Sequence, residues 1–145
     1  MVIHVKEIFS KEDIEFAKEI RKEVFVIEQN VSIEEEMDEF DNIAHHYLAS
    51  IDAIPAGTAR WRNTSNGYKL ERFAVLRKFR GAGVGSALVE KIMEDIESEG
   101  LTKNSTVYLH AQESAVKLYE KYNFAIMSEM FMEANIPHYL MEYQH

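Results

Sequence analysis

Residues 75–88 constrain the fold more than any other stretch, because they pass from a strand pattern through a glycine-rich loop into a helix pattern. Three stretches ahead of them read as strands separated by short turns: residues 46–51, 58–62 and 70–75. Apolar residues behind them recur every four positions: Val84, Leu88, Ile92 and Ile96. The first pattern predicts an antiparallel meander, and the second predicts an amphipathic helix over residues 83–98 that ends at Gly100.

Two short segments are expected to turn the chain within this meander. Residues 54–57 separate its first two strands, and Asn66-Gly67 separates the second strand from the third. Asn-Gly is a preferred pair for a type I′ hairpin, in which both central residues have positive φ.

The rest of the chain completes an α+β pattern. Further strands are expected at residues 2–8, 106–110, 124–127 and 139–143. Further helices are expected from the N-cap residue Ser10 to about residue 25 or 28, and over residues 115–122 with a left-handed Asn123 at the end. The acidic segment 34–41 is a loop or a short second helix, and an aromatic stripe is expected in the core: Phe9, Phe16, Phe25 and Phe40. The order β-α-(α)-β-β-β-α-β-α-β-β predicts one α+β domain over residues 1–145, with a mixed, mostly antiparallel sheet flanked by helices.

Composition and charge exclude several functional classes. The chain has 145 residues, a net charge of -9 and no cysteine, which excludes a disulfide scaffold and a cysteine nucleophile. Such an acidic chain is a poor general ligand for nucleic acid or an anionic membrane. No apolar run is long enough to span a membrane and no signal peptide is recognisable, so a cytoplasmic location is expected. Adjacent His45 and His46 should point to opposite faces of a strand, so no metal site is predicted.

The glycine-rich loop has the chemistry of a phosphate site. Three basic residues flank it, Arg77, Lys78 and Arg80, and a helix N-terminus, which favours anions, follows it directly. A P-loop needs Gly-Lys-Ser/Thr, which is absent, and a Rossmann fingerprint needs a third glycine where Ser86 stands.

Residues 80–85 match R-x-x-G-x-G, and here the chain resembles the GNAT superfamily of N-acetyltransferases. Residues 115–124 resemble the family's A-x-x-x-Y-x-K-x-G-F helix end, with Asn123 in place of the glycine. Residues 21–29, with the acids that follow at residues 35–41, resemble the ElaA/YjcF-type branch. The resemblance covers nearly the whole chain and implies a GNAT-like fold with acetyl-CoA as cosubstrate and no metal.

The resemblance also implies which residues form the site. The cofactor-binding residues are expected to be Phe73, Val75, Arg80, Gly81, Ala82, Gly83, Val84, Gly85 and Ser86. Val75 should offer backbone hydrogen bonds to the pantetheine arm. Tyr119 is expected to protonate the departing CoA thiolate, whereas Tyr122 lies off that face and should pack.

Several groups are candidates for the base that deprotonates the amine. Glu71 is preferred and His110 stands behind it; strand alternation should put Glu71, Phe73 and Val75 on one face. The other candidates are His46, Glu34, Glu35, Glu36 and a chain of water molecules. Glu71 paired with a neighbouring arginine, or His110 as an ordinary strand-end residue, would be structural instead.

The resemblance implies transfer of the acetyl group of acetyl-CoA to a primary amine by direct attack in a ternary complex. The acidic composition favours a small cationic or polar acceptor. A non-catalytic acyl-CoA-binding regulatory module is the alternative, and a purely structural domain is a third reading. The sequence leaves open the acceptor, the acyl-chain limit and whether the chain forms a homodimer.

Overall fold

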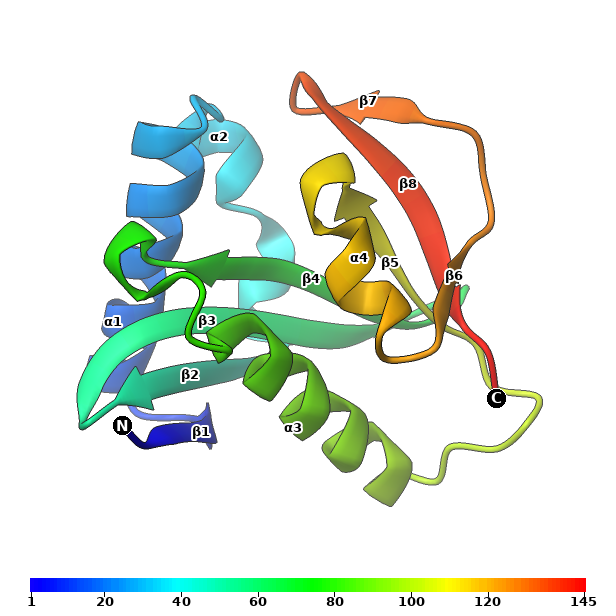
Figure 1. The fold of residues 1–145 in the computed structure, drawn as a ribbon, viewed down its shortest axis with the longest axis horizontal. Helices are drawn as coiled ribbons and strands as arrows, with labels where there is room; N and C mark the ends of the chain where they lie inside the picture. Colours follow the sequence, from blue (N-terminus) through cyan, green and yellow to red (C-terminus); the bar gives the residue numbers. More distant parts are fainter.

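A computed structural model describes residues 1–145 and confirms the mixed, mostly antiparallel sheet (Figure 1). Its strands are β1 (Ile3–Ile8), β2 (His45–Ile51), β3 (Ile54–Thr64), β4 (Gly67–Val75), β5 (Val107–Gln112), β6 (Phe124–Ile126), β7 (Phe131–Glu133) and β8 (Ile136–Tyr143). They run in the order β1-β2-β3-β4-β5-β8-β6, and β7 pairs with β8. Strand β7 was not predicted, because three residues are too few to show an alternating pattern.

The helices follow the predicted order, and four short segments of two other helix types accompany them. The α-helices are α1 (Lys11–Arg21), α2 (Ile33–Glu36), α3 (Val84–Ser98) and α4 (Val116–Glu120). A π-helical segment, Lys22–Glu28, continues α1, and 3₁₀ turns occupy Glu39–Asn42, Arg77–Phe79 and Glu113–Ala115. Ser10 caps α1 by accepting a hydrogen bond from the Asp13 N–H, as predicted. None of these helices combines the length and apolar character needed to cross a membrane.

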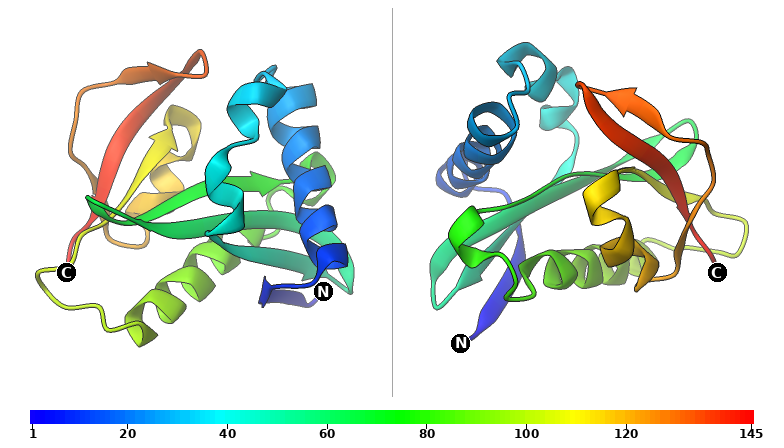
Figure 2. Two further views of the ribbon diagram at one scale, coloured as in Figure 1. Left: turned by 180° about the vertical axis from the view of Figure 1, so that it is seen from behind. Right: turned by 45° about the horizontal axis from the view of Figure 1, so that its top comes forward.

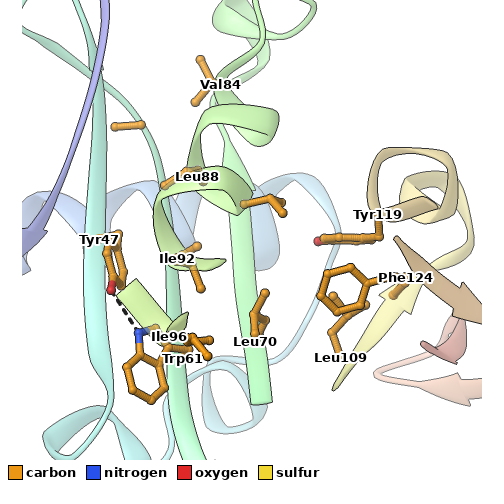
Figure 3. Packing of buried hydrophobic residues seen from close by; sticks show 14 of the residues in the cluster. Tyr47, Trp61, Leu70, Val84, Leu88, Ile92, Ile96, Leu109, Tyr119 and Phe124 are labelled. Carbon is orange, nitrogen blue, oxygen red and sulfur yellow. Dashed lines mark hydrogen bonds between the residues drawn. The ribbon is translucent and has the colours of Figure 1, made fainter. Parts of the chain in front are cut away.

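The sheet separates two hydrophobic clusters. Helix α3 buries Val84, Leu88 and Ile92 against one face, where Trp61 donates a hydrogen bond to the Tyr47 hydroxyl (Figure 3). Helix α1 covers the other face, and Figure 2 shows α1 and α3 on opposite sides of the sheet. Asn123 has φ +67 at the end of α4, as predicted for a left-handed helix end.

Strands β4 and β5 are the only parallel neighbours, and they part after a short contact. Their pairing covers three positions and ends at Leu70 opposite Leu109. Beyond this point β5 turns away with β8, so the two strands open a gap that begins at Glu71 and His110.

A β-bulge on β4 overturns one prediction about side-chain direction. Between the pairs Arg60–Glu71 and Thr58–Ala74, β4 has one residue more than β3, and Arg72 there has φ +60. Because the extra residue reverses the alternation, Glu71 shares a face with Ala74 rather than with Phe73 and Val75. The prediction of one common face was therefore wrong.

The predictions for the two turns of the meander also need correction. Residues 54–57 belong to β3, and the turn lies at Asp52-Ala53, both with positive φ. The second hairpin exists, but only Gly67 has positive φ there, so its turn is not type I′.

The predicted aromatic stripe is only partly buried. Phe9 is 80% exposed and Phe16 42% exposed, since the inner face of α1 is formed by Ala17, Ile20 and Arg21. Phe25 is buried, and Phe40 lies under the guanidinium of Arg62, 3.8 Å from ring centroid to Cζ.

Candidate active site

A cleft of about 590 Å³ opens between the parted strands. Its walls come from the π-helical segment, α2, β4, β5, α4 and the β7–β8 hairpin. One end reaches Val75, Arg80 and Gly85 at the glycine-rich loop, and the other contains charged residues of α2, β4 and β7. We name these two ends after the ligands that the sequence analysis expects there, as the cofactor end and the acceptor end.

The main chain shapes the cofactor end. Gly81 and Gly83 have φ +84 and +94, and a Cβ atom on Gly81 would meet no atom within 4 Å. The first N–H groups of an α-helix have no partner within the helix, and in α3 no side chain caps them either. Unpaired N–H groups next to open space are suited to hold the oxygens of an anion.

The predicted cofactor residues fall into two groups. Four line the cleft: Phe73, Val75, Arg80 and Gly85. The others lie in the loop and the first turn of α3: Gly81, Ala82, Gly83, Val84 and Ser86. The Val84 side chain is buried in the core, so only its backbone is available to a ligand. Gly85 also has a packing role, because a Cβ there would lie 3.2 Å from Leu118.

Arg80 makes contacts that the sequence did not predict. Its guanidinium donates to both carboxylate oxygens of Glu28, at 2.6 and 2.9 Å, and its Nε donates to the Val75 carbonyl at 3.0 Å. The hydrogen bond from Arg80 lowers the pKa of Glu28. Glu28 belongs to the branch-like segment 21–29, which is the only sequence signal that could have singled it out.

Tyr119 lies in the wall of the cleft on α4. Its ring packs edge to face on Phe73, 5.5 Å between centroids, and against Phe124 (Figure 3). The protein makes no hydrogen bond to its hydroxyl. Every fully buried polar side-chain atom of the structure has a hydrogen-bond partner, so this oxygen is not fully buried, and it reaches the cleft that Tyr119 lines. Burial raises the pKa of the phenol. Tyr122, by contrast, donates to Glu90 on the outside of α3.

Glu71 lies at the opening of the strands but is surrounded by cations. Arg60, Arg62 and Lys69 all contact its carboxylate, at 3.4 Å or less. Burial opposes ionisation, but the hydrogen bond from Arg62 and the neighbouring charges outweigh it and lower the pKa. This environment makes Glu71 a weak proton acceptor.

His110 occupies the matching position on β5. It follows Leu109, the last residue paired with β4, and lines the cleft. Its Nδ1 lies 3.0 Å from Oε1 of Glu133 on β7, and Nε2 has no protein partner. Glu133 was not predicted as a site residue, because the sequence does not predict strand β7.

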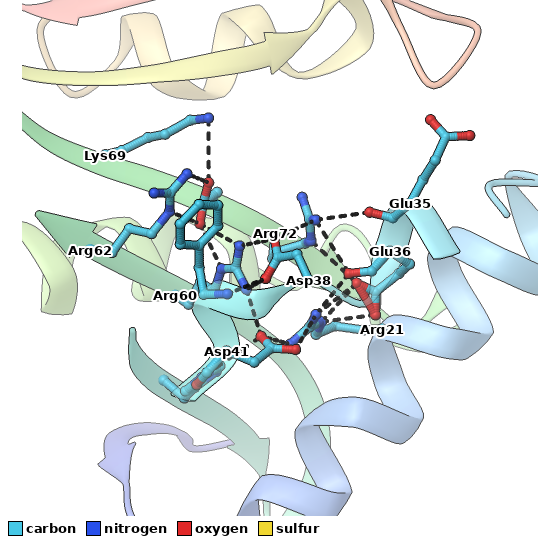
Figure 4. Close-up of polar contacts among 12 residues, drawn as sticks. Arg21, Glu35, Glu36, Asp38, Asp41, Arg60, Arg62, Lys69 and Arg72 are labelled. Atoms are coloured by element: carbon cyan, nitrogen blue, oxygen red, sulfur yellow. Dashed lines mark hydrogen bonds and ion pairs between the residues drawn. The ribbon is translucent and has the colours of Figure 1, made fainter. Parts of the chain in front are cut away.

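A network of ion pairs forms the floor of the acceptor end (Figure 4). It joins Arg21, Arg60, Arg62, Lys69 and Arg72 to Glu36, Asp38, Asp41 and Glu71. Arg21 and Arg60 are each 1% exposed. The acidic segment is thus partly buried rather than a solvated surface: Glu36 is buried, and Glu35 lines the cleft without a cationic side-chain partner.

The remaining base candidates lie outside this arrangement or are occupied. His46 is buried, its Nε2 2.8 Å from the Asp41 carbonyl, and burial lowers its pKa. Its neighbour His45, which was not among the base candidates, stacks on Trp61 at the opposite face, 4.0 Å between centroids. Glu34 does not line the cleft.

Comparisons with known proteins agree with this geometry. The acetyltransferase (GNAT) domain model matches residues 6–145. YjcF of Bacillus subtilis, named an uncharacterized N-acetyltransferase, is 40% identical over 133 residues, covering 91% of this chain and 93% of that protein. An acyl-CoA N-acyltransferase from Pseudomonas aeruginosa superposes with a TM-score of 0.83 at 26% identity, over 98% of each chain. Escherichia coli ElaA superposes with a TM-score of 0.86 at 24% identity, over 99% of this chain and 100% of the other.

Proposed function

Since this chain belongs to the GNAT acetyltransferase family, in its ElaA- and YjcF-like branch, we propose that it transfers the acetyl group of acetyl-CoA to a primary amine. The acceptor is a small polar or cationic amine, and the reaction is a direct attack within a ternary complex. One observation carries this proposal: a single cleft runs from an open glycine loop to the parting point of β4 and β5, with Tyr119 in its wall.

The cofactor binds at the end formed by the loop. Backbone N–H groups of residues 81–86 and the N-terminus of α3 hold the diphosphate, and Arg80 adds a positive charge. Val75, the last residue of β4, offers its backbone to the pantetheine arm. The thioester then lies near the point where the strands part.

The chemical step forms one bond and breaks another. The nitrogen lone pair of the amine forms the C–N bond with the thioester carbon, and the C–S electron pair leaves on sulfur. Tyr119 gives its hydroxyl proton to the sulfur, and a base or water takes the proton from nitrogen. Both protein groups exchange protons with solvent after product release.

The buried setting of Tyr119 is compatible with this role. Burial raises the pKa of the phenol, which makes it a weaker acid. The same exclusion of water raises the pKa of a thiol beside it, because charge is disfavoured on either group. The proton therefore still moves between groups of comparable acidity.

The two residues at the parting point differ as bases. The carboxylate of Glu71 forms ion pairs with three cationic side chains, whereas Nε2 of His110 has no hydrogen-bond partner in the protein. This difference favours His110, with a water chain as the other route.

Release of CoA tests the function directly. A thiol reagent measures the released CoA without a background from protein thiols, because the protein has no cysteine. The panel contains polyamines, amino sugars, aminoglycosides and peptide N-termini, with acetylated products identified by mass spectrometry. We expect one class to be acetylated well above hydrolysis. Preferential acetylation of an anionic acceptor would contradict the acceptor assignment.

Calorimetry with acetyl-CoA at low and high salt separates the alternatives. We expect binding that weakens as salt rises, because the diphosphate meets basic residues. No binding at low salt would overturn the cofactor assignment. Tight binding with no turnover of any amine would instead support a non-catalytic acyl-CoA-binding module.

A further inference from the structure

Strand β7 brings a carboxylate between two imidazoles in the cleft. Oε1 of Glu133 lies 3.0 Å from Nδ1 of His110, and Oε2 lies 3.7 Å from Nε2 of His138. All three residues line the cleft, and neither the sequence motifs nor the proposed function assigns a role to Glu133.

The hydrogen-bond geometry selects one tautomer of His110. An ionised carboxylate can only accept, so Nδ1 of His110 must carry the proton in the contact with Glu133. The pKa of Glu133 is lowered by the hydrogen bond from His110, which keeps the carboxylate ionised. In a neutral ring Nε2 then has a free lone pair, and the protein offers it no partner.

His138 cannot replace His110 in this contact while its ring is neutral. Nδ1 of His138 lies 2.6 Å from the Ile136 carbonyl, which can only accept, so the single proton of a neutral His138 is on Nδ1. Its Nε2 then presents a lone pair to Glu133, in keeping with the longer 3.7 Å separation. The hydrogen bond of Glu133 therefore goes to His110 alone.

The surroundings keep the His110 ring in place at the parting point of β4 and β5. Phe131 packs edge to face on it, 5.2 Å between centroids at 82°, and the Tyr108 ring lies 6.2 Å away. The other titratable groups near His110 and Glu133 come from each packed strand: His138 on β8, Tyr108 on β5 and Lys69 on β4, whose charge also acts on Glu133.

We propose that Glu133 is a positioning residue, which holds His110 as the Nδ1–H tautomer so that Nε2 takes the proton from the acceptor amine. The proposal rests on the acetyl transfer proposed above. As nitrogen forms the C–N bond, its proton moves to Nε2, while the C–S electron pair leaves on sulfur and receives the Tyr119 proton. The carboxylate of Glu133 stabilises the resulting imidazolium, as in other histidine–carboxylate pairs.

The kinetic test compares Glu133→Gln with Glu129→Gln, which removes the same charge from an exposed residue without an ion pair in the segment just before β7. We expect Glu133→Gln to lower kcat about 10-fold and His110→Gln to lower it on the order of 10²-fold, with acetyl-CoA affinity within a few fold. The acidic limb of the kcat/KM profile should move to lower pH in Glu133→Gln, because the imidazolium loses its carboxylate. Glu129→Gln should match the wild type.

A merely structural tie between β7 and β5 predicts another pattern. It would lower the melting temperature of Glu133→Gln but leave the position of the acidic limb unchanged. A Glu133→Gln profile that overlays the Glu129→Gln profile overturns the proposal.

Ring-nitrogen NMR of the free protein gives a readout that needs no acceptor. Long-range ¹H–¹⁵N spectra distinguish the two tautomers, with His110 assigned from the His110→Gln variant. We expect His110 of the wild type to be protonated at Nδ1, and protonation at Nε2 alone would overturn the proposal. If no amine is acetylated, the proposed function fails, and the tautomer still decides whether Glu133 positions His110.

Discussion

The two ends of the cleft differ in which part of the chain forms them, main-chain groups at one end and charged side chains at the other. The cofactor end consists of main chain from one continuous stretch, with two left-handed glycines and a bare helix N-terminus. The acceptor end consists of charged side chains from α1, α2, the 3₁₀ turn Glu39–Asn42, β3 and β4, most of them paired with one another. A local backbone shape can be lost without unfolding the protein, whereas a buried charge network is part of what holds the fold together.

The largest effect should come from removing a buried cation of the acceptor end. Arg60→Ala leaves Asp38, Asp41 and Glu71 short of their shared partner, and we expect a loss of about 3–5 kcal/mol in the free energy of unfolding. Urea unfolding at neutral pH measures it. Arg77→Ala is the control, because Arg77 is 78% exposed and should change stability by less than about 0.5 kcal/mol. Equal stabilities of the two variants would contradict the distinction between the ends.

The matching change at the cofactor end should abolish binding rather than folding. Gly83→Val puts a β-branched residue at φ +94, which distorts the loop, and we expect acetyl-CoA affinity to fall by more than on the order of 10²-fold. Calorimetry measures the affinity and circular dichroism checks the fold. Arg80→Ala should weaken binding far less, since Arg80 is one of several charges there. Unchanged affinity in Gly83→Val would refute the loop assignment.

Tyr119 stands between the two ends and should affect only the chemistry. Tyr119→Phe keeps the ring and its contacts with Phe73 and Phe124, so stability and acetyl-CoA affinity should change little. We expect kcat to fall on the order of 10²-fold, which corresponds to about 2.7 kcal/mol of barrier. Wild-type turnover with a verified acceptor would show that Tyr119 is a structural residue.

Acid should destabilise the acceptor end before it affects the cofactor loop. Burial opposes ionisation of Asp38, but hydrogen bonds and charge from Arg60 hold its pKa at about 2, so its contribution to stability is lost as the pH falls from about 4 toward 2. Burial lowers the pKa of His46, so the unfolded state binds its proton first and stability declines below about pH 6.5. Urea midpoints that stay constant from pH 7 to pH 5 would contradict the His46 contribution.

The smallest effect concerns the ion pair between Glu28 of the π-helical segment and Arg80 of the cofactor loop. Glu28 holds Arg80 in the free protein, so a bound diphosphate must compete with this carboxylate. Glu28→Gln should therefore tighten acetyl-CoA binding about threefold, the scale of an exposed ion pair. Glu23→Gln, an exposed acid on the same segment without an ion pair, is the matched control. Weaker binding in Glu28→Gln would mean that Glu28 orients Arg80 rather than competing for it.

Several features could be predicted from the sequence because they depend on neighbouring residues. The apolar positions of α3 and the N-cap at Ser10 follow from local chemistry, as does the left-handed Asn123. The glycine loop belongs to this class too, since its φ values are properties of the chain at those positions. The residues expected at the cofactor end follow from the resemblance of residues 80–85 to a family motif, which is also a local feature of the chain.

The acceptor end needed tertiary structure, because its interactions join residues far apart in the chain. The bulge at Arg72 reversed the face of Glu71, and no pattern in residues 67–75 announces an extra residue there. Arg21 meets Glu36 and Asp41 across 15 and 20 residues of chain, and His110 meets Glu133 across 23. The sequence by itself thus determined the fold class, the loop and the family resemblance, which are encoded in short stretches. Which of Glu71 and His110 keeps a free proton acceptor was decided by charges that the fold brings together.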